Sequence, residues 1–281
     1  MSQRLTLLAL CLLALPRLAA SGEPAEPVTG ILGAFGTEVR FLVAQLEERE
    51  ERRVEGIPFW TGRLKGRRVV IARSGVGKVN AALTAALLRV HFRPAEVLFS
   101  GIAGAVNPEL KPGDLVIAEK TAQHDYGTIT AKGIERKGAR SPVTGERNPV
   151  WFPADPRLLK AALDAKQRVR FDPIDHGEGP HAPRVVQGVV VTGDTFIALP
   201  AKRDELRKEL GADAVEMEGA AVAQVCYQWR VPCLVIRSIS DLADEKAAGD
   251  VRRFIEAAAR NSALLVAELV ATLAAPAPAA R

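Results

Sequence analysis

Carboxylates stand at several points of this sequence where an apolar run ends and a glycine turn or a helix begins. They are Glu38, Asp194, Glu216, Glu218, Asp241 and Asp244. Hydrophobic side chains accompany them at Phe35, Phe196 and Met217. The chain has four histidines, with no serine–histidine–aspartate order and no metal-ligand spacing. These residue types favour acid–base chemistry by carboxylates, and they predict neither a metal nor a cofactor.

Glu218 begins an apolar stripe with helical spacing. The stripe continues at Val222, Val225, Cys226 and Trp229. A helix dipole is expected to stabilise such an N-terminal carboxylate as an anion, but a buried carboxylate also needs hydrogen-bond donors. Two neighbouring hydroxyls of a sugar would supply them. The alternative is a structural acid that pairs with backbone amides.

Arg237 and Asp241 lie near the end of the apolar run "CLVIRSISD". An arginine at the end of a buried strand needs an acidic partner, and Glu38 is the candidate, whether for function or as a structural ion pair. Glu216 is expected to face away from Glu218. The turn "SGVGKV" lacks the spacing of a P-loop and indicates a close backbone approach instead.

These residues must be positioned by the strands and helices of the fold. Along the chain, apolar runs typical of strands alternate with segments of helical pattern. Strands are predicted at 29–35, 67–72, 95–106, 113–120, 187–194, 212–217 and 231–241. Helices are predicted at 37–50, 74–92, 156–166, 200–210, 218–229 and 251–273. The polar segment 126–184 is expected to form surface loops around its one helix. This alternation predicts a single α/β domain over 30–274, with helices on both faces of its sheet and a ligand site at the carboxyl ends of the strands.

Composition narrows the class of protein. The chain has 281 residues, of which 48% are hydrophobic and 5% aromatic, and its net charge of +5 is spread along the sequence. No basic stripe with interleaved aromatic residues appears, so nucleic acid is not an expected partner. Cys226 and Cys233 both stand in apolar surroundings, which favours two buried thiols over a disulfide.

The N-terminus has the pattern of a signal peptide over 1–21, followed by a polar linker over 22–29. Arg4 precedes an apolar run from Leu5 to Leu15, and cleavage is expected near Ala20 or Ser21. The run is too short to span a bilayer comfortably, although an uncleaved anchor or a buried N-terminal helix is an alternative. Leu10 before Cys11 argues against a lipid anchor. The mature protein is therefore expected to be exported, periplasmic or secreted, without a membrane partner, and its tail over 275–281 is expected to fray.

Seven ordered motifs carry a resemblance to a known family. They are "GILGAFGTEV", "SGVGKVNAA", "SGIAGAVNPELKPGDLVIA", "HD", "VTGDTFI", "AVEMEGAAVAQVC" and "VIRSISDLAD". From about Gly30 to Leu273 the chain resembles the nucleoside phosphorylase superfamily, and within it the 5′-methylthioadenosine/S-adenosylhomocysteine nucleosidases. The resemblance implies one α/β domain with a twisted mixed sheet that partly closes into a barrel, a homodimer, and a small nucleoside as substrate.

The same resemblance implies catalytic roles for two acids. Glu38 would activate the attacking water, with Arg237 positioning it. Asp241 would protonate N7 of the leaving purine, with Ser240 orienting it.

Substrate-binding roles are implied for five further positions. Glu218 would bind the ribose hydroxyls and Met217 would pack on the sugar. Phe196 would stack on the base, the Ile197 backbone would read its edge, and Gly104 would lie against the substrate.

The nucleophile is expected to be water. The related phosphorylases hold phosphate with an arginine and a serine, whereas Phe99 and Ile102 stand in those places here. Glu38 would also repel a phosphate dianion. The alternatives are a phosphate-dependent phosphorylase, a futalosine-type nucleosidase, or a non-catalytic nucleoside-binding protein of the cell envelope. The aromatic pair that usually follows the "HD" motif across the dimer is not evident.

Overall fold

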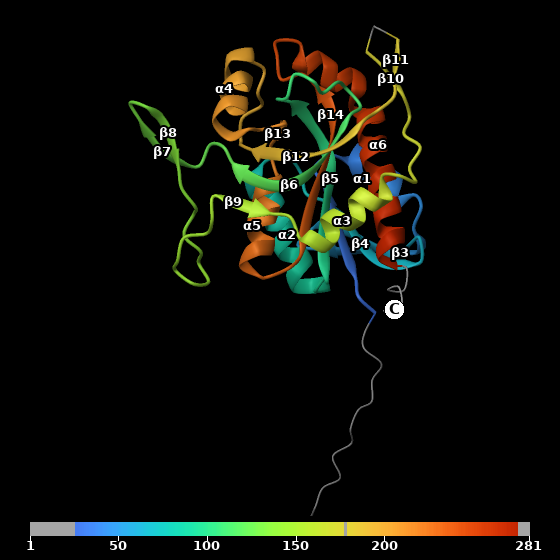
Figure 1. Cartoon of the computed structure of the whole chain (residues 1–281). Helices are drawn as coiled ribbons and strands as arrows, with labels where there is room; N and C mark the ends of the chain where they lie inside the picture. Colours follow the sequence, from blue (N-terminus) through green and yellow to red (C-terminus); the bar gives the residue numbers. More distant parts are fainter. Residues whose placement is uncertain (1–25, 177–178, 275–281) are drawn as a thin grey trace, which may run out of the picture.

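The computed structural model describes residues 26–176 and 179–274 (Figure 1). The predicted signal peptide, the first half of the linker and the C-terminal tail lie outside the described residues. The main sheet has ten strands in the order β13-β12-β6-β14-β5-β1-β4-β3-β2, with β9 paired to β6. The strands are β1 Thr29–Gly33, β2 Glu47–Val54, β3 Ile57–Leu64, β4 Arg67–Arg73, β5 Glu96–Ala105, β6 Leu115–Gln123, β9 Trp151–Pro153, β12 Val185–Thr192, β13 Ala214–Glu216 and β14 Cys233–Asp241.

A second pairing of β13 closes part of this sheet into a ring. β13 runs parallel to β12 and antiparallel to β5, with Val215 opposite Gly104. Five strands thus form a closed, mixed barrel: β13, β12, β6, β14 and β5. The predicted single α/β fold with a partly barrel-like mixed sheet is confirmed.

Helices cover the sheet on two sides, as the alternation predicted (Figure 1). They are α1 Gly36–Val43, α2 Lys78–Phe92, α3 Pro156–Ala165, α4 Pro200–Leu210, α5 Gly219–Gln228 and α6 Ala247–Ala274. One apolar core joins the sheet to α2 and α5, and a second joins it to α1, α3 and α6. Two of the helices begin at residues that are typical of helix starts. The Asp155 side chain caps α3 by accepting a hydrogen bond from the Leu158 amide, and α4 begins at Pro200.

The predicted helix over 37–50 is wrong in its second half. α1 ends at Val43, and the charged run "EEREERRV" forms β2, which pairs antiparallel with β3. Of the side chains of β2 only Val54 is buried. Its strand conformation therefore rests on backbone pairing and not on an apolar pattern, which is why the sequence did not indicate it. The strand β3 was not predicted either.

The polar middle segment is less irregular than predicted. The helix α3 is confirmed, but the segment also forms β9 and two small hairpins. These are β7 Gly127–Thr130 with β8 Gly133–Arg136, and β10 Ile174–Asp175 with β11 Pro180–His181. The β7–β8 hairpin projects from the body of the molecule (Figure 1).

The long helix α6 is a core element of the domain. It is the only helix in the described part of the chain that is long and apolar enough to cross a bilayer. However, 56% of its most apolar stretch is buried inside the fold. It packs against β14, β5, α1 and α3. Cys226 is buried and Cys233 is half-buried, and both are free thiols, as predicted.

Candidate active site

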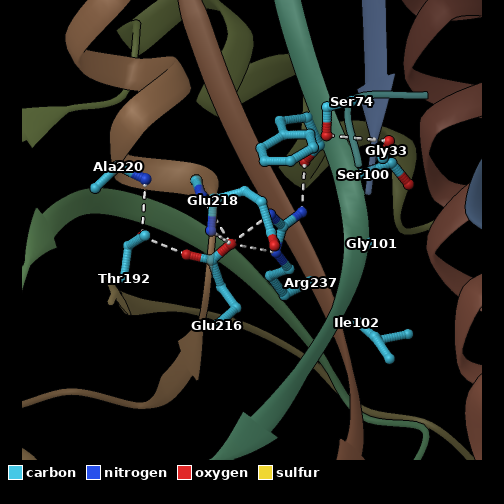
Figure 2. Close-up of polar contacts among 12 residues, drawn as sticks. Gly33, Ser74, Ser100, Gly101, Ile102, Thr192, Glu216, Glu218, Ala220 and Arg237 are labelled. Atoms are coloured by element: carbon cyan, nitrogen blue, oxygen red, sulfur yellow. Dashed lines mark hydrogen bonds and ion pairs between the residues drawn. The ribbon is translucent and has the colours of Figure 1, made fainter. Parts of the chain in front are cut away.

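Three buried carboxylates and one buried arginine meet at the carboxyl ends of the central strands. Glu38 comes from the first turn of α1, just after β1. Glu216 ends β13, Glu218 is the N-cap residue of α5, and Arg237 lies on β14. Figure 2 shows Glu216, Glu218 and Arg237 beside the Gly101–Ile102 segment of β5. Elements that are far apart in sequence thus build one polar centre inside an apolar core.

Glu38 is held by backbone amides. It is 2% exposed, and its carboxylate accepts hydrogen bonds from Phe35 N at 2.8 Å and Ile102 N at 3.1 Å. A Cβ atom on Gly101 would lie 2.7 Å from Glu38 Oε1, so only glycine leaves room for the acid. Burial raises the pKa of Glu38 above its usual range, although the Arg237 charge and the two amides oppose this. A carboxylate with a raised pKa is a stronger proton acceptor, as a general base requires.

The partner of Arg237 is Glu216 and not the predicted Glu38. Arg237 Nη2 lies 2.6 Å from Glu216 Oε2, and its guanidinium stacks on the Phe99 ring at 4.1 Å. The prediction failed because the side chain of Glu216 points into the barrel, where its carboxylate is 2% exposed. Arg237 reaches Glu38 through its electric field only, since no direct hydrogen bond joins the two.

Glu218 begins α5, as predicted, but it is not stabilised as an anion. Burial and the nearby Glu216 charge raise the pKa of Glu218 to about 8, against the opposing effects of Arg237 and of Gly77. Its carboxylate has one hydrogen bond, from Gly77 N to Oε1 at 2.8 Å. Gly77 adopts a φ of +93°, so the close backbone approach predicted for "SGVG" is confirmed.

Asp241 lies at the end of β14 in a separate, mostly apolar setting. Its carboxylate accepts hydrogen bonds from Ser240 Oγ at 2.8 Å and Ala243 N at 2.9 Å. Burial nevertheless raises the pKa of Asp241 to about 6. A Cβ atom on Gly104 would lie 2.8 Å from Asp241 Oδ1. The acid and the predicted glycine are therefore in contact.

A small cavity of about 20 Å³ brings the predicted base-binding residues together. It is lined by Gly104, Thr195, Phe196, Ile197, Val215, Glu216, Met217 and Asp241. Phe196 is 47% exposed and forms the outer wall, whereas Ile197 is buried. Three larger hollows, of 250, 390 and 550 Å³, lie elsewhere on the described part of the protein and contain none of the strand-end acids. We therefore identify the site by its acidic side chains and not by the volume of its cavity.

Phe35 also lies at the site's margin. It precedes α1 and is 37% exposed, and its amide is one of the two that hold Glu38.

The Phe196 turn is anchored by Asp194, one of the strand-end carboxylates, together with Lys78, His124 and Asp125, to which the sequence analysis gave no role. Asp194 Oδ1 accepts the Lys78 amide at 2.7 Å, and Asp125 accepts both Lys78 Nζ and the Asp194 amide. His124 packs against Gly193 so closely that a side chain there would clash. For His124 and Asp125 the sequence signal was the "HD" pair itself. These contacts fix the start of α2 against the turn that carries Phe196.

Comparison with known proteins decides the family. A family model described as the phosphorylase superfamily matches residues 28–271. The chain belongs to the phosphorylase superfamily. The resemblance expected from the ordered motifs is therefore confirmed.

Relatives within the phosphorylase superfamily are similar over most of the chain. A 5′-methylthioadenosine/S-adenosylhomocysteine nucleosidase of Mycobacterium bovis is 36% identical over 249 residues, 88% of this chain and 98% of the relative. The crystal structure of the corresponding Neisseria meningitidis nucleosidase in complex with methylthio-immucillin-A has a TM-score of 0.75 and 36% identity, covering 87% and 99% of the two chains. Futalosine hydrolase of Helicobacter pylori has a TM-score of 0.73 and 31% identity, covering 87% and 97%.

Two of the buried carboxylates lie against the same strand, β5. Glu38 contacts β5 at Gly101, and Asp241 contacts it at Gly104. The described residues contain no group of three or more His, Cys, Asp or Glu side chains that could hold a metal ion. The two contact points are three residues apart, which is about 10 Å of strand.

Proposed function

We propose that the protein hydrolyses the N-glycosidic bond of a purine nucleoside of the 5′-methylthioadenosine or S-adenosylhomocysteine type. The products would be adenine and a ribose derivative. The observation that carries the proposal is the placement of Glu38 and Asp241 at Gly101 and Gly104 of one strand. The two carboxylates contact the strand at different points, as a separate base and acid require.

In the proposed reaction, the bond between the sugar and the purine breaks through a cationic, oxocarbenium-like sugar. Asp241, protonated, donates its proton to N7, so the base leaves as a neutral molecule. Glu38 takes a proton from the water that attacks the anomeric carbon. Glu218 binds the ribose hydroxyls, Met217 packs on the sugar and Phe196 stacks on the base. Each acid–base role is worth about 10²–10⁴-fold in rate.

The surroundings of Glu38 support water over phosphate as the nucleophile. The amides of Phe35 and Ile102, which could bind an anion, already hold the Glu38 carboxylate. The Phe99 ring supports the Arg237 guanidinium, whose charge is engaged by Glu216. A phosphate dianion would therefore meet carboxylates and no free cation among these residues. A non-catalytic binding protein would need neither of the two acids.

The substrate class rests on similarity to the nucleosidases. One similar structure, from Colwellia psychrerythraea, is described in complex with adenine, with 34% identity and a TM-score of 0.76. The similarity to futalosine hydrolase supports a second candidate, in which a futalosine-type nucleoside is the substrate.

A substrate panel tests both candidates and the nucleophile. Purified protein is incubated with methylthioadenosine, adenosylhomocysteine, adenosine and futalosine, each with and without phosphate, and free base is measured by chromatography. We expect release of adenine at the same rate in both buffers. Strict dependence on phosphate would identify the protein as a phosphorylase. Preference for futalosine would support the second candidate. Tight binding of a nucleoside without release of its base would indicate a non-catalytic binding protein.

Two further features belong to the proposal. The signal-peptide pattern supports export to the periplasm or the exterior. The outer face of α2 supports a homodimer, because Val79, Leu83 and Val90 are 78%, 52% and 60% exposed there. A second copy of the chain would cover that apolar face.

A further inference from the structure

Glu216 binds three separate elements of the active site through one carboxylate (Figure 2). Its Oε2 atom accepts Arg237 Nη2 at 2.6 Å and Arg237 Nε at 3.2 Å from β14. The same atom accepts the amides of Glu218 at 3.0 Å and Gly219 at 2.7 Å, where α5 begins. Its Oε1 atom accepts the Thr192 hydroxyl at the end of β12, and that hydroxyl in turn accepts the Ala220 amide. Glu216 itself is 6% exposed.

Because of these bonds, the Glu218 side chain does not have to cap the helix that it begins. An N-cap residue usually satisfies the first amides of its helix with its own side chain. In α5 the Glu218 side chain makes no such bond, and Glu216 and Thr192 serve the first amides instead. The Glu218 carboxylate keeps a single hydrogen bond, from Gly77, among the described residues. Its remaining acceptor capacity is available to a ligand.

Glu216 also decides where the buried positive charge of Arg237 acts. Three elements bring carboxylates to Arg237: Glu38 from α1, Glu216 from β13 and Glu218 from the start of α5. Direct contact is made only by Glu216. Across the Gly77 turn, Asp194 adds a further negative charge and Lys78 a positive one, which is engaged by Asp125. Glu38 and Glu218 are therefore left without a direct cationic partner.

We propose that Glu216 is a positioning residue for nucleoside hydrolysis: it fixes Glu218 for the ribose and keeps the Arg237 guanidinium out of direct contact with Glu218 and Glu38. The inference rests on the proposed function for the identity of the ligand. It assigns distinct duties to the two glutamates of "EMEG", with Glu216 facing the protein and Glu218 facing the substrate.

The test compares Glu216→Gln with Thr192→Val. The Gln variant removes the anion but keeps the size of the side chain and one oxygen acceptor. The Val variant removes a hydrogen bond to Glu216 but leaves the charge in place. The first readout is the titration of the Glu218 carboxyl by carbon-13 NMR in the substrate-free protein, assigned with Glu218→Gln. The second is the pH profile of kcat/KM with methylthioadenosine.

In Glu216→Gln, the loss of a neighbouring anion and the release of the Arg237 charge both lower the pKa of Glu218. We expect its titration to move from about 8 toward acid by at least about one pH unit. The acidic limb of the kcat/KM profile, set by Glu38, should move the same way, and KM should rise about tenfold. Thr192→Val should raise KM by a smaller factor and leave both titrations unmoved.

An unmoved Glu218 titration in Glu216→Gln would overturn the inference, as would equal shifts in both variants. If the Gln variant does not fold, the titration of Glu218 in the wild-type protein is the test. A Glu218 that titrates in the ordinary carboxyl range would overturn the inference that Glu216 keeps the Arg237 guanidinium away from it. An inactive wild type with a shifted titration in the Gln variant would refute the proposed function and leave the role of Glu216 in place.

Discussion

The Ser240 hydroxyl donates a 2.8 Å hydrogen bond to Oδ2 of the adjacent Asp241, at the last residue of β14. This bond and the Ala243 amide favour the ionised carboxylate, yet burial outweighs them and raises the pKa of Asp241 from 3.8 to about 6. Desolvation thus keeps the proposed acid protonated to a higher pH, while the Ser240 hydroxyl holds its carboxyl group. The consequence is an enzyme whose acid form disappears as the pH rises.

Replacing Asp241 should separate activity from stability. We expect Asp241→Asn to lower kcat by about 10²–10⁴-fold. Because the raised pKa means that the folded protein binds this proton more tightly than the unfolded chain, the stability contribution is lost as the pH rises from 3.8 through about 6. At pH 8 the variant should therefore be more stable to urea by about 1–3 kcal/mol. Near-normal turnover would remove Asp241 as the acid, and Ser240→Ala, with an intact acid, is the control.

The role of Glu218 can be tested from both sides of the contact. We expect Glu218→Ala to lower kcat/KM by about 10–100-fold, because hydrogen bonds to ribose hydroxyls are lost. The wild type should discriminate against a 2′,3′-dideoxy analogue, and the variant should lose most of that discrimination. If the variant keeps the full preference for the hydroxyls, they bind elsewhere.

Gly101 should tolerate no side chain. A Cβ atom there would lie 2.7 Å from Glu38 Oε1 and 3.0 Å from Arg237 Nη1. We expect Gly101→Ala to displace the base and reduce kcat at least about tenfold. Gly249→Ala is the matched control, since a Cβ atom at Gly249 meets nothing within 4 Å. A folded Gly101→Ala protein with normal kcat would show that the Glu38 position is not critical.

The outer face of α2 predicts the oligomeric state. Leu83→Glu places a charge in the middle of the exposed apolar stripe, and we expect sedimentation analysis to change from dimer to monomer. Val143→Glu is the control, because Val143 is 61% exposed on a loop outside α2. A wild type that sediments as a monomer would contradict the prediction outright.

Export predicts that the signal peptide is removed and that the mature protein is shorter than the full sequence. Expressed in a bacterium with its full sequence, the protein should appear outside the cytoplasm and begin near residue 21. Leu8→Arg, which interrupts the apolar run, should keep the full-length chain in the cell. An intact N-terminus on the wild-type protein would contradict cleavage.

The sequence identified the acids more reliably than their partners. Apolar runs predict strands, and the carboxyl ends of such strands are where sites form, so Glu38, Glu218 and Asp241 could be singled out. The pairing of Arg237 with Glu216 could not be predicted, because alternation along β13 gives two faces without saying which one faces the barrel interior. That choice depends on the pairing of β13 with β5, which is a long-range contact.

Strand pairing also explains the largest error in the fold. The charged side chains of β2 are compatible with a helix surface or an exposed strand, and a continuous pattern from α1 favoured the helix. Only the antiparallel partner β3 decides in favour of a strand. Local pattern is sufficient where side chains are buried and insufficient where backbone pairing alone holds the element.

The place of β14 in the sheet has a consequence for the order of folding. This strand is made by residues 233–241, yet it lies between β5 and β6 in the centre of the barrel. A growing chain that has not reached Cys233 has neither a closed barrel nor Asp241. Cooperative folding must therefore wait for nearly the whole polypeptide, and such non-local assembly is slow. If the chain is exported as proposed, this delay would leave the barrel open until synthesis is nearly complete.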